Sequence, residues 1–271
     1  MLLAQLTDTH ILAPDFDGEQ YVDNNDRLAK AIAALNAENV RPEVVLFTGD
    51  LTDTGSAVEM ALLAELLAPL EIPLLPLPGN HDLRETFRTA FEMPWATEDS
   101  HLGWVAELDD LTIVGVDTII PGEHGGLIDD ERLEWLTESL DDTGDRPTAI
   151  AMHHPPFLSG IHWMDEMGLD GRDRFVELVG RYPNLTRIFC GHIHRPLVAN
   201  VGGAVATVGL STVHHVHLDL DPAAPVAVIR DPVGYQLHQF DGATWVSHNR
   251  YIETGEDPIT PAWAESASSF S

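Results

Sequence analysis

The 271-residue sequence contains a single cysteine, Cys190, and a single lysine, Lys30. One cysteine cannot form an internal disulfide bond, which excludes a disulfide-stapled scaffold and is typical of a reducing compartment. The neighbours of Cys190 in the stretch TRIFCG are largely apolar and favour a buried structural thiol. We attribute the scarcity of lysine to genomic composition or adaptation to salt, without a role in the chemistry.

Positive charge is scarce in general. The chain has 14 Lys and Arg residues against 44 Asp and Glu residues, and its formal net charge is −30. Proteins that bind phosphate backbones do so through clusters of Lys and Arg, so this balance argues against a nucleic-acid polymer or an anionic membrane as partner. Small anionic substrates are not excluded, because a bound metal ion can reverse the sign of the local field.

Long apolar runs are also missing. The opening stretch MLLAQLTDTH has no basic segment, and its apolar run is far shorter than the ~18 residues of a membrane span. We therefore expect a cytoplasmic protein. The hydrophobic content of 44% suits a soluble globular chain, and its length allows one large α/β domain with a sizeable core.

Short apolar strands alternate with amphipathic helices as far as residue 191. We expect strands at 2–7, 43–49, 72–79, 147–154 and 186–191, a hairpin at 103–117, and helices at 26–38, 57–70, 85–91, 129–142 and 171–182. Prolines place the strand at 72–79 near an edge or an end.

The pattern changes after residue 196, where only short strands follow. They are expected at 197–201, 204–209, 213–220, 225–230, 234–240 and 244–251. Alternating βα units followed by such a run predict a single α/β domain over residues 1–252, with a mixed sheet or two packed sheets. The Pro- and Ser-rich residues 253–271 form an expected tail, either poorly ordered or docked.

Polar side chains with metal-binding chemistry follow five of the expected strands. The motifs are DTH (8–10), GDLTD (49–53), GNHD (79–82), HHPP (153–156) and GHIH (191–194). Ligands of open α/β sheets bind beyond the carboxyl ends of the strands, so we expect these loops to converge on one site. Residues two apart at a strand end point to the same side, which lets both members of DTH and of GHIH face one centre.

Each motif is weak evidence when taken alone. DTH is commonly a turn, HHPP can be a loop stiffened by prolines, and one HxH proves little in a chain with 14 histidines. Their joint occurrence, each after an apolar strand, argues against a metal-free surface. Gly49, Gly79 and Gly191 each precede a candidate ligand, and a glycine permits the tight turn or close backbone approach that a ligand requires.

Taken together, these motifs resemble the signature of the calcineurin-like metallophosphoesterase superfamily over about residues 1–220. The segments VDTIIPGEHGGLIDDERLEWL, MHHPP, and NLTRIFCGHIH followed by STVHHV resemble class III cyclic nucleotide phosphodiesterases and bacterial dimetal glycerophosphodiesterases. The resemblance implies a four-layer α/β/β/α sandwich of two mixed sheets. It also implies a homo-oligomer, a dimer or higher.

The resemblance further implies a ligand set for two metal ions. One ion would be held by Asp8, His10 and His194, the second by Asn80, His153 and His192, and Asp50 would bridge the two. Imidazole, carboxylate and amide ligands suit manganese, iron, cobalt or zinc, with manganese or iron favoured here. Two divalent ions, two aspartates and one bridging hydroxide leave a net charge of about +1, which can attract a phosphodiester monoanion.

The expected chemistry is in-line attack by a metal-bridging hydroxide, with Asp50 as the central ligand. His81 adjoins Asn80 without being needed as a ligand, so we expect it to contact phosphate and protonate the leaving group. Asp53 and Asp82 could orient neighbouring groups or cap the following helix.

Other residues are assigned to the substrate pocket. We expect Asn80, His81 and His215 to contact the substrate, although the histidines at 214, 215 and 217 lie in a strand pattern that favours structural roles. Residues 158–171 form a long connection with exposed-looking His162, Trp163 and Met164. That loop could wall the pocket or could be a solvated or oligomer contact.

The sequence thus predicts a dimetal phosphodiesterase that acts on a 3′,5′-cyclic nucleotide such as cyclic AMP or on a glycerophosphodiester. A phosphomonoesterase or nuclease on the same scaffold is an alternative, although the acidic composition disfavours nuclease work. A non-catalytic metal-binding regulatory protein is another, which the complete ligand set disfavours.

Overall fold

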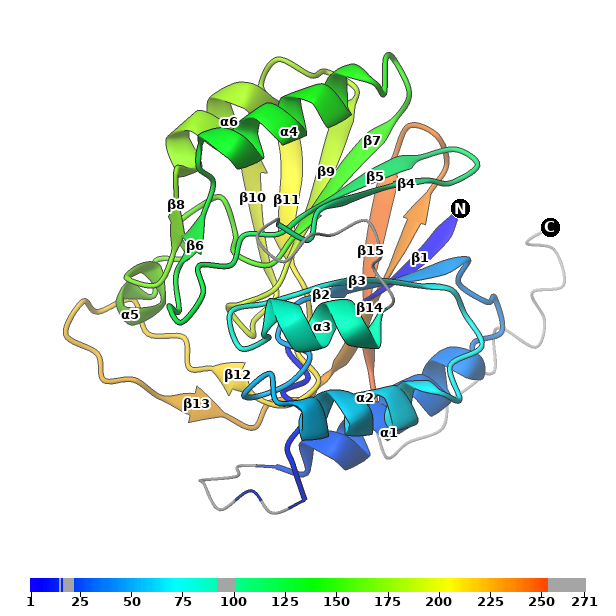
Figure 1. The fold of residues 1–271 in the computed structure, drawn as a ribbon, viewed down its shortest axis with the longest axis vertical. Helices are drawn as coiled ribbons and strands as arrows, with labels where there is room; N and C mark the ends of the chain where they lie inside the picture. The colour runs from blue at the N-terminus through cyan, green and yellow to red at the C-terminus, as the bar shows by residue number, and fades with distance from the viewer. Residues whose placement is uncertain (15, 17–21, 92–100, 253–271) are drawn as a thin grey trace, which may run out of the picture.

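Two mixed β-sheets form the centre of the molecule, as a computed structural model shows for residues 1–14, 16, 22–91 and 101–252 (Figure 1). The five-stranded sheet has the order β15 (Trp245–Tyr251), β14 (Gly234–Phe240), β1 (Leu2–Leu6), β2 (Val44–Thr48) and β3 (Leu74–Leu77). The six-stranded sheet has the order β10 (Leu197–Val201), β11 (Ala204–Val208), β9 (Leu185–Cys190), β7 (Thr148–Met152), β5 (Thr112–Val116) and β4 (Trp104–Glu107).

The central strands of both sheets are parallel. β1, β2 and β3 run in one direction, and so do β5, β7, β9 and β11 within the other sheet. Antiparallel partners lie at the margins: β14 and β15 in the first sheet, β4 and β10 in the second. Because the parallel strands of a sheet share a carboxyl edge, each sheet presents a row of loops at one side.

Helices cover the outer face of each sheet (Figure 1). α1 (Asn24–Asn36), α2 (Ala57–Leu67) and α3 (Arg84–Ala90) lie with the five-stranded sheet, whereas α4 (Asp130–Asp141) and α6 (Arg172–Val179) cover the six-stranded one. Their buried faces belong to two apolar clusters, one for each helix-and-sheet pair. The predicted four-layer α/β/β/α arrangement is therefore confirmed.

Local sequence explains where the main helices begin. Asp23 accepts a hydrogen bond from the Asp26 amide at the start of α1. Ser56 and Glu59 form a reciprocal capping box at the start of α2. The expected apolar stripe of α1, which includes Leu28 and Ile32, is fully buried.

Several expected elements differ in length from the observed ones. The strands expected at 213–220 and 225–230 shrink to β12 (His215–Val216) and β13 (Val228–Ile229), because the segment between them is exposed and contains two prolines. The short elements α5 (His162–Asp165), β6 (Gly126–Leu127) and β8 (Leu169–Asp170) were not expected, since they are too brief to carry a period. β3 lies at a sheet edge, as its prolines indicated.

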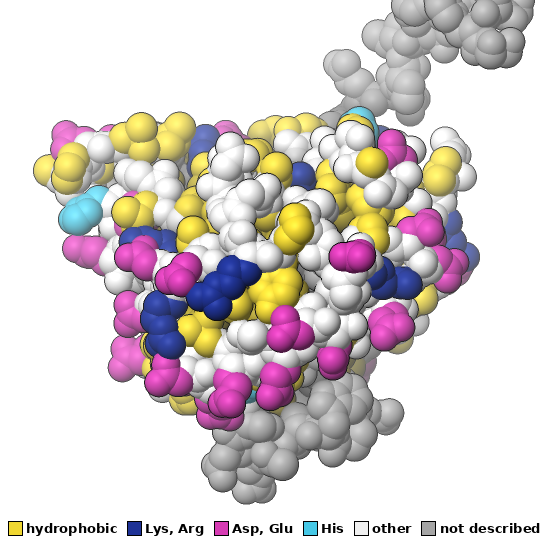
Figure 2. All heavy atoms as spheres, turned by 90° about the horizontal axis from the view of Figure 1, so that it is seen from above, with side chains coloured by type: hydrophobic (Ala, Val, Ile, Leu, Met, Phe, Trp, Pro, Cys, Tyr) yellow, Lys and Arg dark blue, Asp and Glu magenta, His cyan; other side chains and the backbone are white. Residues whose placement is uncertain are grey.

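Residues 253–271 lie outside the described residues. The division into a domain at 1–252 and a tail therefore stays a prediction. Within the described ranges, every helix is too short or too polar to cross a membrane. Figure 2 shows acidic side chains spread over one face of the molecule, with fewer basic ones among them.

Candidate metal centre

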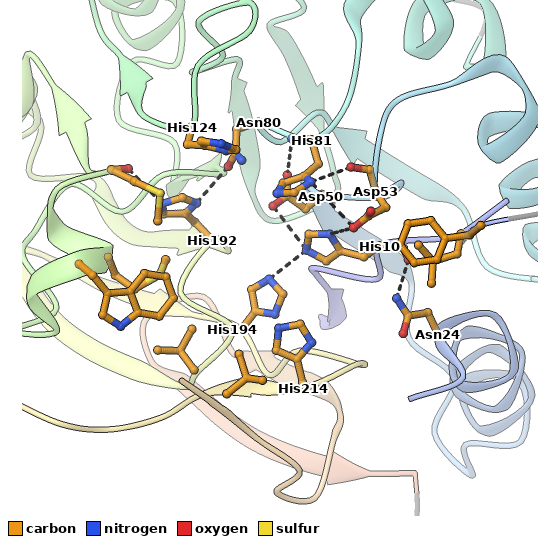
Figure 3. A pocket seen from close by; sticks show the side chains of 17 residues that line it. His10, Asn24, Asp50, Asp53, Asn80, His81, His124, His192, His194 and His214 are labelled. Atoms are coloured by element: carbon orange, nitrogen blue, oxygen red, sulfur yellow. Dashed lines mark hydrogen bonds and ion pairs between the residues drawn. The ribbon is translucent and has the colours of Figure 1, made fainter. Parts of the chain in front are cut away.

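Four of the five motif loops line one pocket of about 230 Å³ (Figure 3). His153 of the fifth motif contacts the pocket residues Asn80 and Asp50. Each predicted ligand follows the strand it was expected to follow: Asp8 and His10 after β1, Asp50 after β2, Asn80 after β3, His153 after β7, and His192 and His194 after β9. Except for Asn80, which is partly exposed, these side chains are buried. The convergence expected from strand polarity is observed.

One group of donor atoms is formed by Asp8, His10, Asp50 and His194, which can place their donor atoms within 4.8 Å of one another. The Nε2 atoms of His10 and His194 are 2.9 Å apart. His194 Nε2 lies 3.5 Å from Asp8 Oδ1, and His10 Nε2 lies 3.6 Å from Asp50 Oδ2. Two imidazole nitrogens and two carboxylates aimed at one point are a donor set that suits a divalent transition metal ion.

A second group lies on the other side of Asp50. Asn80 Oδ1 is 3.2 Å from His153 Nε2 and 3.1 Å from His192 Nδ1. His153 Nε2 is also 3.2 Å from Asp50 Oδ2. The same carboxylate oxygen of Asp50 thus faces both groups, while its Oδ1 accepts a hydrogen bond from the His81 amide at 2.9 Å.

Contacts to the outer nitrogen of three of the four candidate histidine ligands leave the inward nitrogen available to a metal ion. His153 Nδ1 donates to the Thr48 carbonyl at 2.8 Å, and His192 Nε2 donates to the Met167 carbonyl at 3.0 Å. His10 Nδ1 lies 3.2 Å from Asp53 Oδ1. Such outer contacts fix the tautomer and orientation of metal-binding histidines.

His154 is close to the second group but differs from its neighbour. Its Nδ1 lies 2.7 Å from Thr118 Oγ1, and its Nε2 lies 3.1 Å from the His124 carbonyl. Because both ring nitrogens are occupied, His154 is a poor ligand, even though the ring stands beside His153 and His192. It instead anchors the segment that carries His124.

The backbone is strained at the candidate ligands. Among the described residues other than glycine, positive φ angles occur at Asp8 (53°), His10 (42°), Asp50 (50°), His192 (72°) and His194 (51°). A non-glycine residue in this region costs of order 1–3 kcal/mol and persists where the surroundings fix it. Such outliers gather at functional sites, and all five here belong to the predicted site.

Two features hold these strained loops in place. The Asp82 carboxylate accepts hydrogen bonds from the amides of Leu51, Thr52 and Gly79 and from the Thr52 hydroxyl, which ties the loops after β2 and β3 together. A Cβ atom at Gly79 would overlap the backbone nitrogen of Asp50, so only glycine allows this approach.

Burial shapes the electrostatics of the site. It raises the pKa of Asp8 to about 6 and lowers the pKa of His192 to about 3. Burial also opposes the charged forms of Asp50 and His153, but their mutual attraction outweighs it. The pKa of Asp50 is therefore held well below its ordinary value, and that of His153 is raised to about 9. A cation beside Asp50 would take the place of the proton on His153.

Comparisons with known proteins agree with this geometry. A family model described as calcineurin-like phosphoesterase matches residues 1–196. The chain belongs to this family. Its two donor groups, which share Asp50, fit the two ions of a dimetal phosphoesterase.

Several proteins with sequences similar to this chain are named as phosphodiesterases. A protein of Arcobacter nitrofigilis named "Probable glycerophosphodiester phosphodiesterase GpdQ" is 34% identical and covers 95% of this chain and 96% of its own length. The cyclic AMP phosphodiesterase CpdA of Pseudomonas aeruginosa is 34% identical over 72% of this chain and 70% of its own. A dimetal phosphatase from Danio rerio superposes with a TM-score of 0.68 at 14% identity, over 93% and 96% of the two chains, which shows the fold alone.

His81 lines the phosphoesterase pocket beside Asn80 (Figure 3). Its Nδ1 donates a hydrogen bond to the Asp53 carbonyl at 2.7 Å, which leaves Nε2 as the ring nitrogen not used in this contact. Asp53 contacts His10, and Asp82 binds the amides of Leu51 and Gly79, so both carboxylates orient neighbouring groups of the site. This was one of the two roles expected for them. Neither caps a helix, because Ser56 caps α2 and α3 has no side-chain cap.

The placement expected for His215 is wrong. His215 lines a separate hollow with Arg195 and Asp231, whereas His214 lines the phosphoesterase pocket, its ring centroid 4.6 Å from that of His194. Adjacent residues of an extended segment face opposite sides, so a shift of one position changes which histidine reaches the site.

The pocket also contains residues that the sequence did not single out. His124, from the loop after β5, stands with its ring 6.0 Å from that of His81, and Asn24 of α1 donates a hydrogen bond to the His10 carbonyl. His124 lies within the GEHGG stretch, but no local pattern marks it as part of the site. Its position depends on how that loop packs on His154.

The loop at 158–171 walls the pocket, which was one of its two interpretations. Trp163, Met164 and Met167 line the phosphoesterase pocket. His162 is exposed as expected, but Met164 is buried because it packs into the core of the six-stranded sheet.

Proposed function

We propose that the protein hydrolyses small phosphodiesters with the help of two bound divalent metal ions. The observation that carries this proposal is the position of Asp50 Oδ2, which lies 3.6 Å from His10 Nε2 and 3.2 Å from His153 Nε2. One carboxylate oxygen that serves two donor groups is the arrangement a dinuclear centre requires.

The proposed ligands divide into two sets that share Asp50. One ion would be held by Asp8, His10 and His194, and the other by Asn80, His153 and His192. When bound, such a pair of ions activates a water molecule and neutralises phosphoryl oxygens. With two aspartates against four positive charges, the centre attracts an anionic diester inside a protein of net charge −30.

His81 is the proposed proton donor to the leaving group. The Asp53 carbonyl accepts a hydrogen bond from Nδ1, and the Asp53 carboxylate lies 4.0 Å from the same nitrogen, so these contacts fix the orientation of the ring. With Nδ1 engaged by Asp53, Nε2 is the nitrogen that would deliver a proton to an alkoxide beside Asn80. Asp53 thus positions His81 as well as His10.

The substrate is proposed to be a glycerophosphodiester, with a 3′,5′-cyclic nucleotide as the second candidate. Relatives named for the first substrate match 95% and 93% of the chain, and relatives named for cyclic nucleotides match 72% and 87% of it. The apolar wall of Trp163, Met164 and Met167 suits the body of either substrate better than a long polyanion.

The test uses metal-free protein reconstituted with Mn(II). Hydrolysis of bis-p-nitrophenyl phosphate, p-nitrophenyl phosphate, glycerophosphocholine and cyclic AMP is compared under the same conditions. Diester hydrolysis should fall by at least about 10³-fold in Asp50→Ala and Asn80→Ala. His162→Ala, which removes an exposed histidine of the wall loop, should keep near-normal activity. Activity restricted to the monoester would contradict the proposal, and inactivity with every metal would favour a metal-binding regulatory protein.

Finer properties are part of the same proposal. We propose manganese or iron as the native metals, a homo-oligomer as the working form and the cytoplasm as the location. The all-nitrogen-and-oxygen donor set supports these metals. Elemental analysis of protein purified without added metal, together with light scattering, measures the first two directly.

A further inference from the structure

A second hollow, of about 360 Å³, opens between strands β9 to β11 of one sheet and β14 to β15 of the other. It is lined by Arg187, Leu197, Thr207, Gln236, Trp245 and Ser247, among others. The proposed metal ligands are not among its lining residues, so it is separate from the catalytic pocket.

Strand alternation explains why polar groups meet there. Arg187 and Phe189 lie on the same face of β9, and Thr207 of β11 pairs with Phe189. Gln236 of β14 pairs with Asn249 of β15 on the opposing sheet. Between two packed sheets, the inward-facing positions of each strand are normally apolar. Here these positions hold a cation, a hydroxyl and amides.

Arg187 is a buried cation that forms no ion pair with the residues that the structure describes. Its relative exposure is 5%, and its Nη2 donates to Ser247 Oγ at 2.5 Å. The rings of Phe189 and Trp245 lie 5.5 and 5.9 Å from its Cζ atom and compensate part of the charge. Burial lowers the pKa of Arg187 to about 10, so the guanidinium remains charged at neutral pH.

The missing carboxylate distinguishes Arg187 from Arg132, the other buried arginine among the described residues. Buried Arg132 and half-buried Arg84 pair with Asp129 and Asp117 respectively, and the sequence contains 44 acidic residues. Within the described residues, no carboxylate lies within ion-pair distance of Arg187. A buried charge without a partner is costly, which leaves room for an anion from solution.

Three buried atoms that line this hollow lack hydrogen-bond partners among the residues described. They are Arg187 Nε, Thr207 Oγ1 and Gln236 Oε1, on side chains that are 5%, 4% and 6% exposed. Gln236 Nε2 donates to Asn249 Oδ1 at 2.8 Å, which fixes Oε1 as an acceptor. These three atoms therefore offer a ligand one charged N–H donor, one hydroxyl and one acceptor.

We propose that this hollow binds a small oxyanion that carries its own hydroxyl group, of which hydrogen phosphate is the simplest example. The Arg187 fork supplies the charge and an N–H, and the Thr207 hydroxyl donates to a second oxygen. Gln236 Oε1 accepts the hydroxyl of the anion. A simple carboxylate leaves that last atom unpaired and therefore binds more weakly.

Calorimetry on the full-length, metal-loaded protein tests this inference. Inorganic phosphate and acetate are titrated into the natural protein and into Arg187→Met, Thr207→Val and Arg174→Met. The natural protein should bind phosphate at the hollow in addition to any phosphate at the metal centre. Arg187→Met should weaken the additional site by at least about tenfold. Arg174→Met, at an exposed arginine, should bind like the natural protein.

Other outcomes are equally decisive. Thr207→Val keeps the side-chain shape, so it reports on the hollow even if Arg187→Met does not fold, as circular dichroism shows. Unchanged phosphate binding in Thr207→Val and in any folded Arg187→Met protein would overturn the proposal and leave the hollow to water. Equal affinities for acetate and phosphate would contradict the hydroxyl requirement. Diester hydrolysis should persist in Thr207→Val, so this test is independent of the proposed catalytic function.

Discussion

At the scale of single residues, hydrogen bonds decide which histidines can bind a metal. His153 and His154 are adjacent and equally buried, yet only His153 keeps one ring nitrogen turned toward Asn80 and Asp50. Both nitrogens of His154 are held by neighbouring loops. A count of buried histidines therefore overstates the number of metal ligands. The count is corrected by excluding a histidine such as His154, whose two ring nitrogens are both engaged by other groups.

His192 and His194 come from the same loop but face different donor groups. His192→Ala should weaken the ion held with Asn80, whereas His194→Ala should weaken the ion held with Asp8, each by roughly 100-fold or more. Co(II) titration followed by absorption spectroscopy should show one tight and one weak ion in each variant, with different spectra. Identical spectra for the two variants would contradict separate assignments.

Cys190 should be chemically silent in the folded protein. The residue is fully buried, and burial raises the pKa of its thiol, so little thiolate is present at neutral pH. Ellman's reagent should therefore release one equivalent of product in guanidinium chloride and almost none from native protein within minutes. Rapid labelling of native protein would contradict this burial.

At the scale of elements, loops are fixed by buried carboxylates that reach across strands. Asp82 joins the loops after β2 and β3, and Asp117 at the end of β5 accepts hydrogen bonds from Arg84 and from the Leu102 and Ile119 amides. These contacts hold in place the loops that carry the site. They are as much a part of the site's construction as the ligands.

Asp117→Ala should destabilise the protein strongly. The substitution leaves the Arg84 guanidinium without its carboxylate partner in a partly buried position, and breaking such a pair costs about 3–5 kcal/mol. Asp130→Ala is the matched control, because Asp130 pairs with Arg174 at the surface, where such pairs contribute about 0–1 kcal/mol. Urea unfolding measures both, and equal losses would contradict the assigned role of Asp117.

The sequence predicted the parts of the site that depend on local order. DTH, GNHD and GHIH follow strands with apolar character, and strand polarity brings the loops of each sheet to one edge of that sheet. The packing of the two sheets then places the GHIH loop of one against the DTH loop of the other. His124 and His214 depend on how separate loops pack, which no periodicity encodes. The confusion of His215 with His214 arose because a two-residue strand has no pattern to fix its register.

At the scale of the whole molecule, metal ions and net charge oppose each other. The chain has a formal charge of −30, and self-repulsion of that size destabilises a compact state. Two divalent ions at the proposed centre, where loops of both sheets meet, would reduce the repulsion and join loops from both layers. We therefore expect the metal-loaded protein to be markedly more stable than the metal-free one.

Metal removal tests this expectation. Each ion at a hundredfold excess over its Kd adds about 2.7 kcal/mol to the free energy of unfolding, which corresponds to a rise in Tm of several degrees. Thermal unfolding should show this rise when Mn(II) is added to chelator-treated protein. Asp50→Ala, which loses the oxygen that faces both donor groups, should show little or no rise. An equal rise in the variant would place the stabilising ions elsewhere.

The five positive φ angles at Asp8, His10, Asp50, His192 and His194 have a consequence for how the protein can change by mutation. Together they store roughly 5–15 kcal/mol, as much as the net stability of a typical domain. Glycine at any of these positions relieves strain and removes a ligand at the same time. A search for more heat-resistant variants that scores folding alone will therefore enrich changes at these positions, and the variants it selects will be inactive.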